Sequence, residues 1–461
     1  MTGKRLQGYS QQEADCNMST DGISVRTLSA NAFFILLANT ISSCALLAQF
    51  LMFTNLFSRV EAGTYALQIA FMAPFFLAAS LQQRRILATS SPEKGYGTAA
   101  HLKTFLGAHF ITVLLLFGLY TATAETSLLL VIAPMMVLRI LENGADACYG
   151  FFQQQNRYAY LSISRWLHAS VLIATTAYCG YVLQYSLWQI LVACAATRAL
   201  VACGYEFRLA WQLLRQEKLV LPEEPAAVKP GMEITSVEKN LLRLGIPLGL
   251  SGLMASIVGN TPQYVLDGID RVELIPAFVI LSRLALIGAN LTRAVNESFA
   301  RPMTQAFVNK KTVPLKKLLL MAFGVDLAIG LMILLTCQLA YFPVDQALQL
   351  SANGASRLDL TCVFVSMIVN NITGLSVVVM SVFRDSRRIF WLQMLSMVLV
   401  IGTCLLLIPR WGLSGSLISI ALGKLPALFL GGFYIREHLR EIAREEQIRK
   451  LQEPLPERMA A

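Results

Sequence analysis

Apolar runs of about 20 residues recur along almost the whole chain, and short polar segments separate them. A run of this length is what an α-helix needs to cross the hydrocarbon core of a bilayer. The pattern therefore predicts an all-α polytopic membrane protein with about twelve transmembrane helices. The expected spans are 27–54, 64–83, 102–122, 127–149, 158–183 and 187–209, followed by 244–266, 274–297, 315–341, 360–383, 389–408 and 413–435.

The long polar stretch 211–243 divides these spans into two sets of six. It mixes glutamates with basic residues and contains three prolines, which suits a solvated connector rather than a span. We expect two six-helix lobes around a central cavity. The predicted organisation is a cytoplasmic tail (1–26), an N-terminal lobe (27–210), a cytoplasmic linker (211–243), a C-terminal lobe (244–435) and a second cytoplasmic tail (436–461).

Weak similarities between the two halves suggest an internal repeat. Ser58–Ala66 and Asp270–Ala277 share an Arg-Val-Glu motif at the first outer turn of each half. Phe151–Ser164 and Val382–Leu395 both join the fourth span of a half to the fifth through a short basic turn. Because six helices and a cytoplasmic linker separate the copies, they should have the same orientation, related by an axis along the membrane normal.

Composition supports a membrane protein and limits the other classes. Hydrophobic residues make up 55% of the chain and charged residues only 14%, too few to cover a water-facing surface. The net charge of +10 does not require a nucleic acid partner, since basic residues flank spans on the cytoplasmic side. The nine cysteines and four histidines show no metal-ligand spacing, and we expect no cofactor. The outer loops hold only four basic residues, which places both termini in the cytoplasm: Arg59, Arg271, Arg357 and Arg410.

Basic residues inside the spans are the main functional signal. Each Arg or Lys at mid-membrane costs about 2.5–3.5 kcal/mol unless it reaches water or a partner. The most central are Arg198, Arg283 and Lys424, which have no acidic residue within one helical turn, and we expect them to face one water-filled cavity. Arg165 and Arg293 lie nearer span ends, where they can snorkel to the interface or join the same site. Such a cavity would attract an anion, and diphosphate suits guanidinium groups well.

Embedded acids are fewer. Glu142 and Asp146 are four residues apart on one helix face, and Arg139 precedes Glu142 by three residues, which allows an ion pair. Asp326 lies alone in its span. One interpretation is that these acids neutralise the cations in structural pairs. The other is that Asp326, Glu142 or Asp146 carries a coupling H⁺ or Na⁺.

Two further features leave alternatives open. Glycines crowd the start of the seventh span at positions 245, 249 and 252, and Pro426 follows Lys424 closely in the twelfth. These residues suit either ordinary helix packing or bending during a conformational switch. The C-terminal tail has charges at helical spacing with a thin apolar edge, which predicts a solvated helix or one that docks a partner.

Three stretches resemble Wzx-type polysaccharide flippases, of the MOP superfamily that also holds the MATE exporters and the MurJ flippases. They are Leu56–Pro74, Gly245–Asp270 and Phe383–Gly423, the last with an IPRWGLSG turn before the final span. The resemblance implies translocation of an undecaprenyl-diphosphate-linked oligosaccharide across the bacterial inner membrane, without covalent chemistry. The implied partners are this lipid-linked oligosaccharide, membrane lipids and other polysaccharide assembly proteins.

Two rival functions are less favoured by the residues. A MATE-like exporter of cationic drugs would need a net acidic cavity, whereas the embedded charges here are mostly basic. A polytopic glycosyltransferase, polymerase or ligase would need catalytic acids or a large outer loop, and the longest outer loop, 342–358, is short. We therefore expect a transporter with no catalytic residues.

Overall fold

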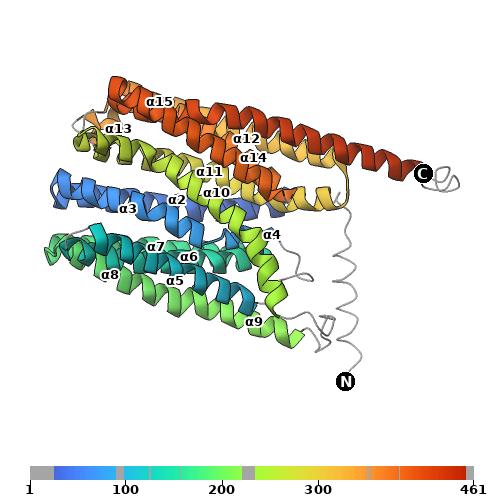
Figure 1. Ribbon diagram of the computed structural model, residues 1–461, viewed down its shortest axis with the longest axis horizontal. Helices are drawn as coiled ribbons and strands as arrows, with labels where there is room; N and C mark the ends of the chain where they lie inside the picture. The colour runs from blue at the N-terminus through green and yellow to red at the C-terminus, as the bar shows by residue number, and fades with distance from the viewer. Residues whose placement is uncertain are drawn as a thin grey trace.

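A computed structural model of the chain describes residues 25–89, 98–123, 126–155, 157–220, 234–348, 350–351, 355–383 and 385–452. Residues 1–24 of the predicted N-terminal tail, the centre of the predicted linker and the last nine residues lie outside these ranges. The described residues form helices and turns, without a β-strand. Figure 1 shows the helices running roughly alongside one another in an elongated bundle.

The first half of the chain supplies a set of long helices that begin and end near the expected span limits. Their bounds are α2 (Val25–Leu56), α3 (Arg59–Ala79), α4 (Gln83–Thr89), α5 (Thr98–Thr123), α6 (Thr126–Gln154), α7 (Tyr158–Ala177), the π-helical segment η2 (Tyr178–Val182), α8 (Leu187–Val201), the π-helical segment η3 (Ala202–Phe207) and α9 (Arg208–Val220).

The second half continues with α10, which runs obliquely from the α9 side of the bundle towards α15 (Figure 1). The bounds are α10 (Ile234–Gly268), the 3₁₀ segment η4 (Val272–Leu274), α11 (Ile275–Val308), α12 (Thr312–Leu339), α13 (Tyr341–Leu348), α14 (Arg357–Val382) and α15 (Ser386–Gln452). Helices α9 and α10 extend into the stretch predicted as a linker.

Within the part of the chain that is described, nine helical stretches are long and apolar enough to cross a membrane. One of them, Arg387–Ile448, covers both the eleventh and the twelfth expected spans. The fourth and fifth expected spans coincide with α6 and α7, which fall outside this set of nine. Both are polar for membrane helices, since α6 carries Arg139, Glu142 and Asp146, and α7 carries Arg165 and His168.

Helix α15 is two helices joined by a tight turn. Gly412 has φ +54° and ψ −124°, far from helical values, and it follows the Ile-Pro-Arg-Trp motif of the predicted turn. The two arms then pack closely, because a Cβ at Gly423 would lie 2.4 Å from Val400 Cγ2. Glycine suits both positions, because it adopts the positive φ at Gly412 and leaves room for the close approach at Gly423. The expected spans 389–408 and 413–435 are therefore the two arms of one hairpin.

The packing of α2 and α10 supports the predicted repeat. Helix α2, the first of its half, packs against α7 of the same half and against α11, the second long helix of the other half. Helix α10, the first of the second half, packs against α15 of its own half and against α3, the second helix of the first half. This reciprocal exchange is what a two-fold axis between six-helix copies produces.

We call the end of the bundle that holds α4 and the C-terminal part of α15 the inner end, following the predicted orientation. In the outer half, one hydrophobic cluster joins the two halves of the chain, from Phe53 and Met72 to Phe278 and Phe364. In the inner half the apolar core is divided. One cluster around Met303 and Met380 belongs to the second half, and another around Phe152 and Leu161 belongs to the first.

The C-terminal part of α15 contacts the inner turns of its own half. Lys310 Nζ lies 2.9 Å from Glu445 Oε2, and the backbone N–H of Thr312 donates to Glu446 Oε2 at 3.2 Å. The side chain of Ile442 is buried in the inner cluster of the second half. One edge of this helix is therefore docked on the protein itself, and most of its other residues are exposed or half-buried, as expected of a solvated helix with a thin apolar edge.

Candidate substrate-binding site

A cavity of about 950 Å³ occupies the inner half, between the two divided cores. Helices α4 and α6 of the first half contribute to its wall, and α10, α11, α14 and α15 of the second half close the other side. The wall mixes apolar side chains with many carboxamides, such as Gln82, Asn370 and Gln393. The two halves therefore pack together at the outer end and are separated by the cavity at the inner end. In this state the protein is closed on its outer side.

Among the described residues, three cationic side chains and one carboxylate line this cavity. Arg84 and Asp146 come from the first half, and Arg293 and Lys424 come from the second. The lining therefore carries an excess of positive charge. Lys424 is 9% exposed, and its ammonium group donates a hydrogen bond to Asn370 Oδ1, an uncharged partner. Arg293 is exposed in the cavity wall.

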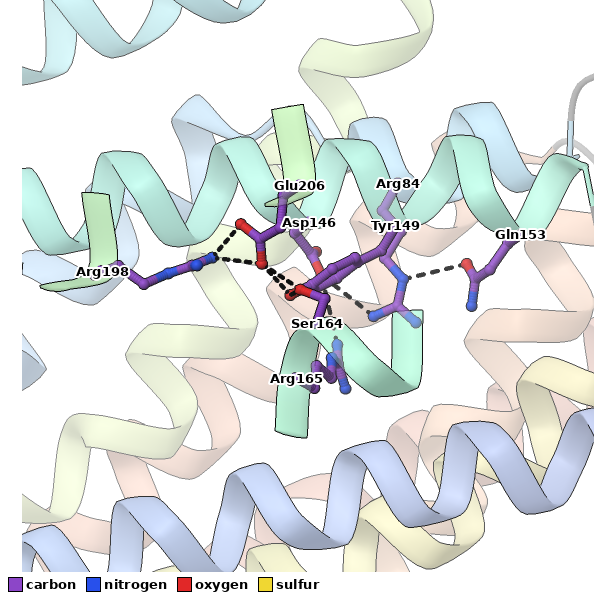
Figure 2. A network of polar contacts seen from close by, with 8 residues as sticks. All are labelled: Arg84, Asp146, Tyr149, Gln153, Ser164, Arg165, Arg198 and Glu206. Carbon is purple, nitrogen blue, oxygen red and sulfur yellow. Dashed lines mark hydrogen bonds and ion pairs between the residues drawn. The ribbon is translucent and has the colours of Figure 1, made fainter. Parts of the chain in front are cut away.

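A network of polar contacts supports the first-half wall of the cavity (Figure 2). Asp146 Oδ1 lies 3.3 Å from Arg84 Nη1 and 3.7 Å from Arg165 Nη2, so one carboxylate holds two guanidinium groups. Arg84 also donates to Gln153 Oε1 at 3.2 Å. The Arg165 guanidinium lies over the ring of Tyr149, 5.1 Å from its centre. Arg165 thus lies behind the cavity lining, as a support for Asp146.

Arg198 does not face the cavity, and this corrects the sequence-based expectation. Its guanidinium is 2% exposed and forms an ion pair with Glu206, whose Oε2 lies 2.8 Å from Nη2. Glu206 Oε1 also accepts hydrogen bonds from the hydroxyls of Tyr149, at 2.7 Å, and of Ser164 (Figure 2). A buried arginine held one-to-one by a carboxylate is a structural element of the first lobe.

The π-helical segment η3 explains why sequence reasoning missed Glu206. On a regular α-helix, seven residues bring a side chain back to the same face, and a position eight residues away has rotated off it. A π-helix adds one residue within the turn. Since η3 begins at Ala202, between the two charged residues, Glu206 returns to the face of Arg198. Glu206 is eight residues from Arg198, beyond the single helical turn within which the sequence analysis looked for an acid.

The outer boundary of the cavity is also charged. Arg139 Nη1 lies 2.7 Å from Glu142 Oε2, which confirms the predicted ion pair. Arg283, on α11, interacts electrostatically with this pair and with Tyr65. No ion pair or hydrogen bond to Arg283 is found among the described residues, and it does not belong to the cavity lining found there. Arg283 thus lies beyond the cavity rather than in its wall.

Asp326 is 2% exposed on α12 and lies outside the lining of the cavity. Its Oδ2 accepts a hydrogen bond from Asn296 Nδ2 at 2.8 Å, and Asn296 itself lines the cavity. Its recorded partner is an uncharged amide, which distinguishes Asp326 from Glu142 and Asp146, whose carboxylates are paired with arginines.

Hydrogen bonds between α3 of the first lobe and α10 of the second also join the two lobes. Pro74 lies inside α3 and has no N–H, so the carbonyl of Ala70 loses its usual helical donor. Two side chains of α10 replace that donor. Tyr264 donates its hydroxyl to Ala70 O at 2.5 Å, and Asn260 donates Nδ2 to it at 3.4 Å.

The crowded glycines of α10 contact the break between α3 and α4. Leu81 and Gln82 have positive φ at this break. A Cβ at Gly249 would lie 2.6 Å from Ala78 O, and a Cβ at Gly252 would lie 2.8 Å from Gln82 Nε2. The sequence left open whether these glycines serve helix packing or helix bending. In this state they allow close packing of α10 against the break between α3 and α4.

The described helices and the charged hollow between two repeated halves define a polytopic α-helical membrane protein. No protein-family model matches the chain. It is 20% identical over 406 residues to the capsular polysaccharide biosynthesis protein CapF of Staphylococcus aureus, covering 86% of this chain and 96% of that one.

Several solved structures have the same fold. A MATE transporter in complex with MaL6 superposes with a TM-score of 0.71 and 16% identity, over 91% of this chain and 97% of that one. An outward-facing multidrug resistance MATE transporter of the MOP superfamily gives 0.68 and 17%, over 91% and 96%. A MOP superfamily transporter from Pyrococcus furiosus, described as having a binding pocket of reverse polarity that suggests a different function, gives 0.68 and 16%, over 90% and 96%.

These comparisons confirm the predicted fold class, with two six-helix lobes around a central cavity. The chain thus shares the fold of MOP superfamily transporters, and its similarity to a polysaccharide biosynthesis protein is in line with the resemblance to Wzx-type flippases.

Proposed function

We propose that this protein is a flippase for an undecaprenyl-diphosphate-linked oligosaccharide, acting in the synthesis of a capsule, O-antigen or exopolysaccharide. The diphosphate binds in the inner cavity, and the lobes then rock to present the substrate on the opposite side. The lipid tail stays in the bilayer throughout.

The excess of positive charge in the cavity carries the proposal. Arg84, Arg293 and Lys424 line it against the single described carboxylate of Asp146. A low-dielectric cavity with such a lining concentrates anions. Arg293 and Lys424 are the principal ligands, because Arg84 already shares Asp146 with Arg165. The carboxamides of the wall offer hydrogen bonds to sugar hydroxyls.

The rival functions fit the cavity less well. A cationic drug would meet Lys424 and Arg293 without a matching set of carboxylates. The reverse polarity described for the Pyrococcus furiosus protein suggests that pocket charge distinguishes functions within this fold. An enzyme would need a reacting group with an activating partner, whereas the paired acids here are held by arginines.

The same proposal places the protein in the bacterial inner membrane with both termini in the cytoplasm. The cavity then faces the side on which a lipid-linked precursor is assembled. A coupling ion, H⁺ or Na⁺, would use Asp326, because its carboxylate has a neutral partner and needs no arginine to be displaced.

Binding to the purified protein tests the proposal. The probe is farnesyl diphosphate, added to the protein in lipid nanodiscs. Loss of one charged contact to a phosphate is worth about 1.5–3 kcal/mol, so Arg293→Gln and Lys424→Gln should each raise the Kd at least about tenfold. Arg410→Gln, on the exposed outer turn of α15, is the matched control. Unchanged affinity in both cavity variants would refute the proposed binding site.

A cellular assay tests the direction of transport. Cells that lack this protein should accumulate lipid-linked repeat units on the inner face of the membrane. Unpolymerised units exposed on the outer face would instead indicate a polymerase or a ligase.

A further inference from the structure

The cavity-facing stripes of two helices continue beyond the cavity. On α11, Leu286, Ala289 and Arg293 line the cavity at spacings of three and four residues. Arg283 precedes Leu286 by three residues, so it continues the same helix face outward by one turn. On α6, Asn143 and Asp146 line the cavity, and Arg139 precedes Asn143 by four residues. Two arginines from opposite lobes therefore extend the lining stripes towards the outer end.

These two arginines belong to one electrostatic cluster. Arg283 interacts with Arg139, Glu142 and Tyr65, and Tyr65 in turn interacts with all three. Arg139 is paired with Glu142 at 2.7 Å, which leaves the charge of Arg283 uncompensated within the cluster. Tyr65 belongs to the outer hydrophobic core that joins the lobes. A surplus cation thus lies at the closed seam, next to the outer end of the cavity.

We propose that Arg139 and Arg283 form a second site for the phosphate groups of the substrate, closed in this state and assembled for binding when the outer halves separate. The inference rests on the proposed function and adds a step to it. Arg293 and Lys424 hold the diphosphate first, and Arg283 with Arg139 receives it during the switch. Ten residues separate Arg293 from Arg283 on α11, so the phosphate advances about 15 Å along one helix.

Such a site also gives the substrate a means of driving the switch. A ligand shifts a conformational equilibrium only if it binds one state better than the other. The inner cavity already exists in the present state, so binding there alone does not favour outward opening. A phosphate that neutralises Arg283 at the opened seam stabilises the outward-open state specifically.

The experiment measures affinity and conformation in the same samples. After replacement of the native cysteines, spin labels are placed at Val60 of the first lobe and Leu339 of the second, both exposed near the outer end. Double electron–electron resonance then gives the population of the outward-open state with and without farnesyl diphosphate. The variants are Arg283→Gln, Arg293→Gln, Lys424→Gln and, as control, Arg410→Gln.

We expect farnesyl diphosphate to raise the outward-open population of the wild type and of Arg410→Gln. In Arg283→Gln the Kd should stay within twofold of wild type, while the ligand-induced shift is lost. A wild-type protein that binds without shifting, or an Arg283→Gln variant that shifts like wild type, overturns the second site. A Kd raised tenfold by Arg283→Gln also overturns it, because that result makes Arg283 a ligand of the inner cavity. Unchanged binding in both Arg293→Gln and Lys424→Gln refutes the proposed inner binding site instead.

Discussion

The hydrogen bond from Tyr264 to the carbonyl of Ala70 offers a direct test of how the outer half is held closed. Tyr264 is on α10 and Ala70 is on α3, so the bond joins the two lobes. Replacing Tyr264 with Phe removes the hydroxyl and keeps the ring. The change should leave the packing within each lobe intact and weaken only the closed state.

The magnitude follows from measured hydrogen bonds between membrane helices. They average about 0.6 kcal/mol and reach about 1.7 kcal/mol. The bond here is short, at 2.5 Å, and Asn260 would remain as a second, longer donor at 3.4 Å. We therefore expect the ratio of outward-open to closed protein to rise by about 3-fold, and by no more than about 20-fold.

Double electron–electron resonance between spin labels at Val60 and Leu339, without ligand, measures the ratio of outward-open to closed protein. Tyr120→Phe is the matched control, because Tyr120 donates to Gln68 Oε1 at 2.5 Å between two helices of the same lobe. This variant loses a tyrosine hydroxyl bond of the same length, here to a side-chain oxygen, but should not shift the equilibrium. Equal shifts in the two variants, or no shift in Tyr264→Phe, would refute the assignment of the bond as an outer latch.

Further predictions concern the same latch and the buried contacts of the lobes. Pro74→Ala restores an N–H that competes for the carbonyl of Ala70, so the outward-open population should rise as in Tyr264→Phe, measured with the same labels. Gly249→Ala should lower the melting temperature in detergent, since its Cβ would meet a backbone oxygen at 2.6 Å, whereas Gly259→Ala has no atom within 4 Å and should not. Glu206→Gln leaves a buried guanidinium unpaired and should cost about 3–5 kcal/mol of stability; a second change, Arg198→Met, should recover much of the loss if the unpaired charge is the cause.

The fold could be predicted because membrane helices follow from apolar length alone. The turn at Gly412 and the ion pair of Arg139 with Glu142 were also predictable, since each depends on residues close in sequence. Which basic side chains face the cavity could not be predicted, because the direction of each side chain depends on the rotation of its helix and, for Arg198, on the change of register at η3. Arg84 was overlooked for a similar reason. Two residues with positive φ redirect the chain before α4 and bring a side chain expected in a loop to the cavity wall.

The division of the apolar core has a thermal consequence. In the present state a single core joins the lobes at the outer half, whereas the described clusters of the inner half each belong to one half of the chain. Separating the outer halves hydrates part of that shared core, and hydration of apolar surface carries a large positive heat capacity. The free energy of opening should therefore curve with temperature, and the apolar part of the seam should loosen on cooling. A transport rate that curves on an Arrhenius plot would be the kinetic sign that opening exposes this shared apolar core.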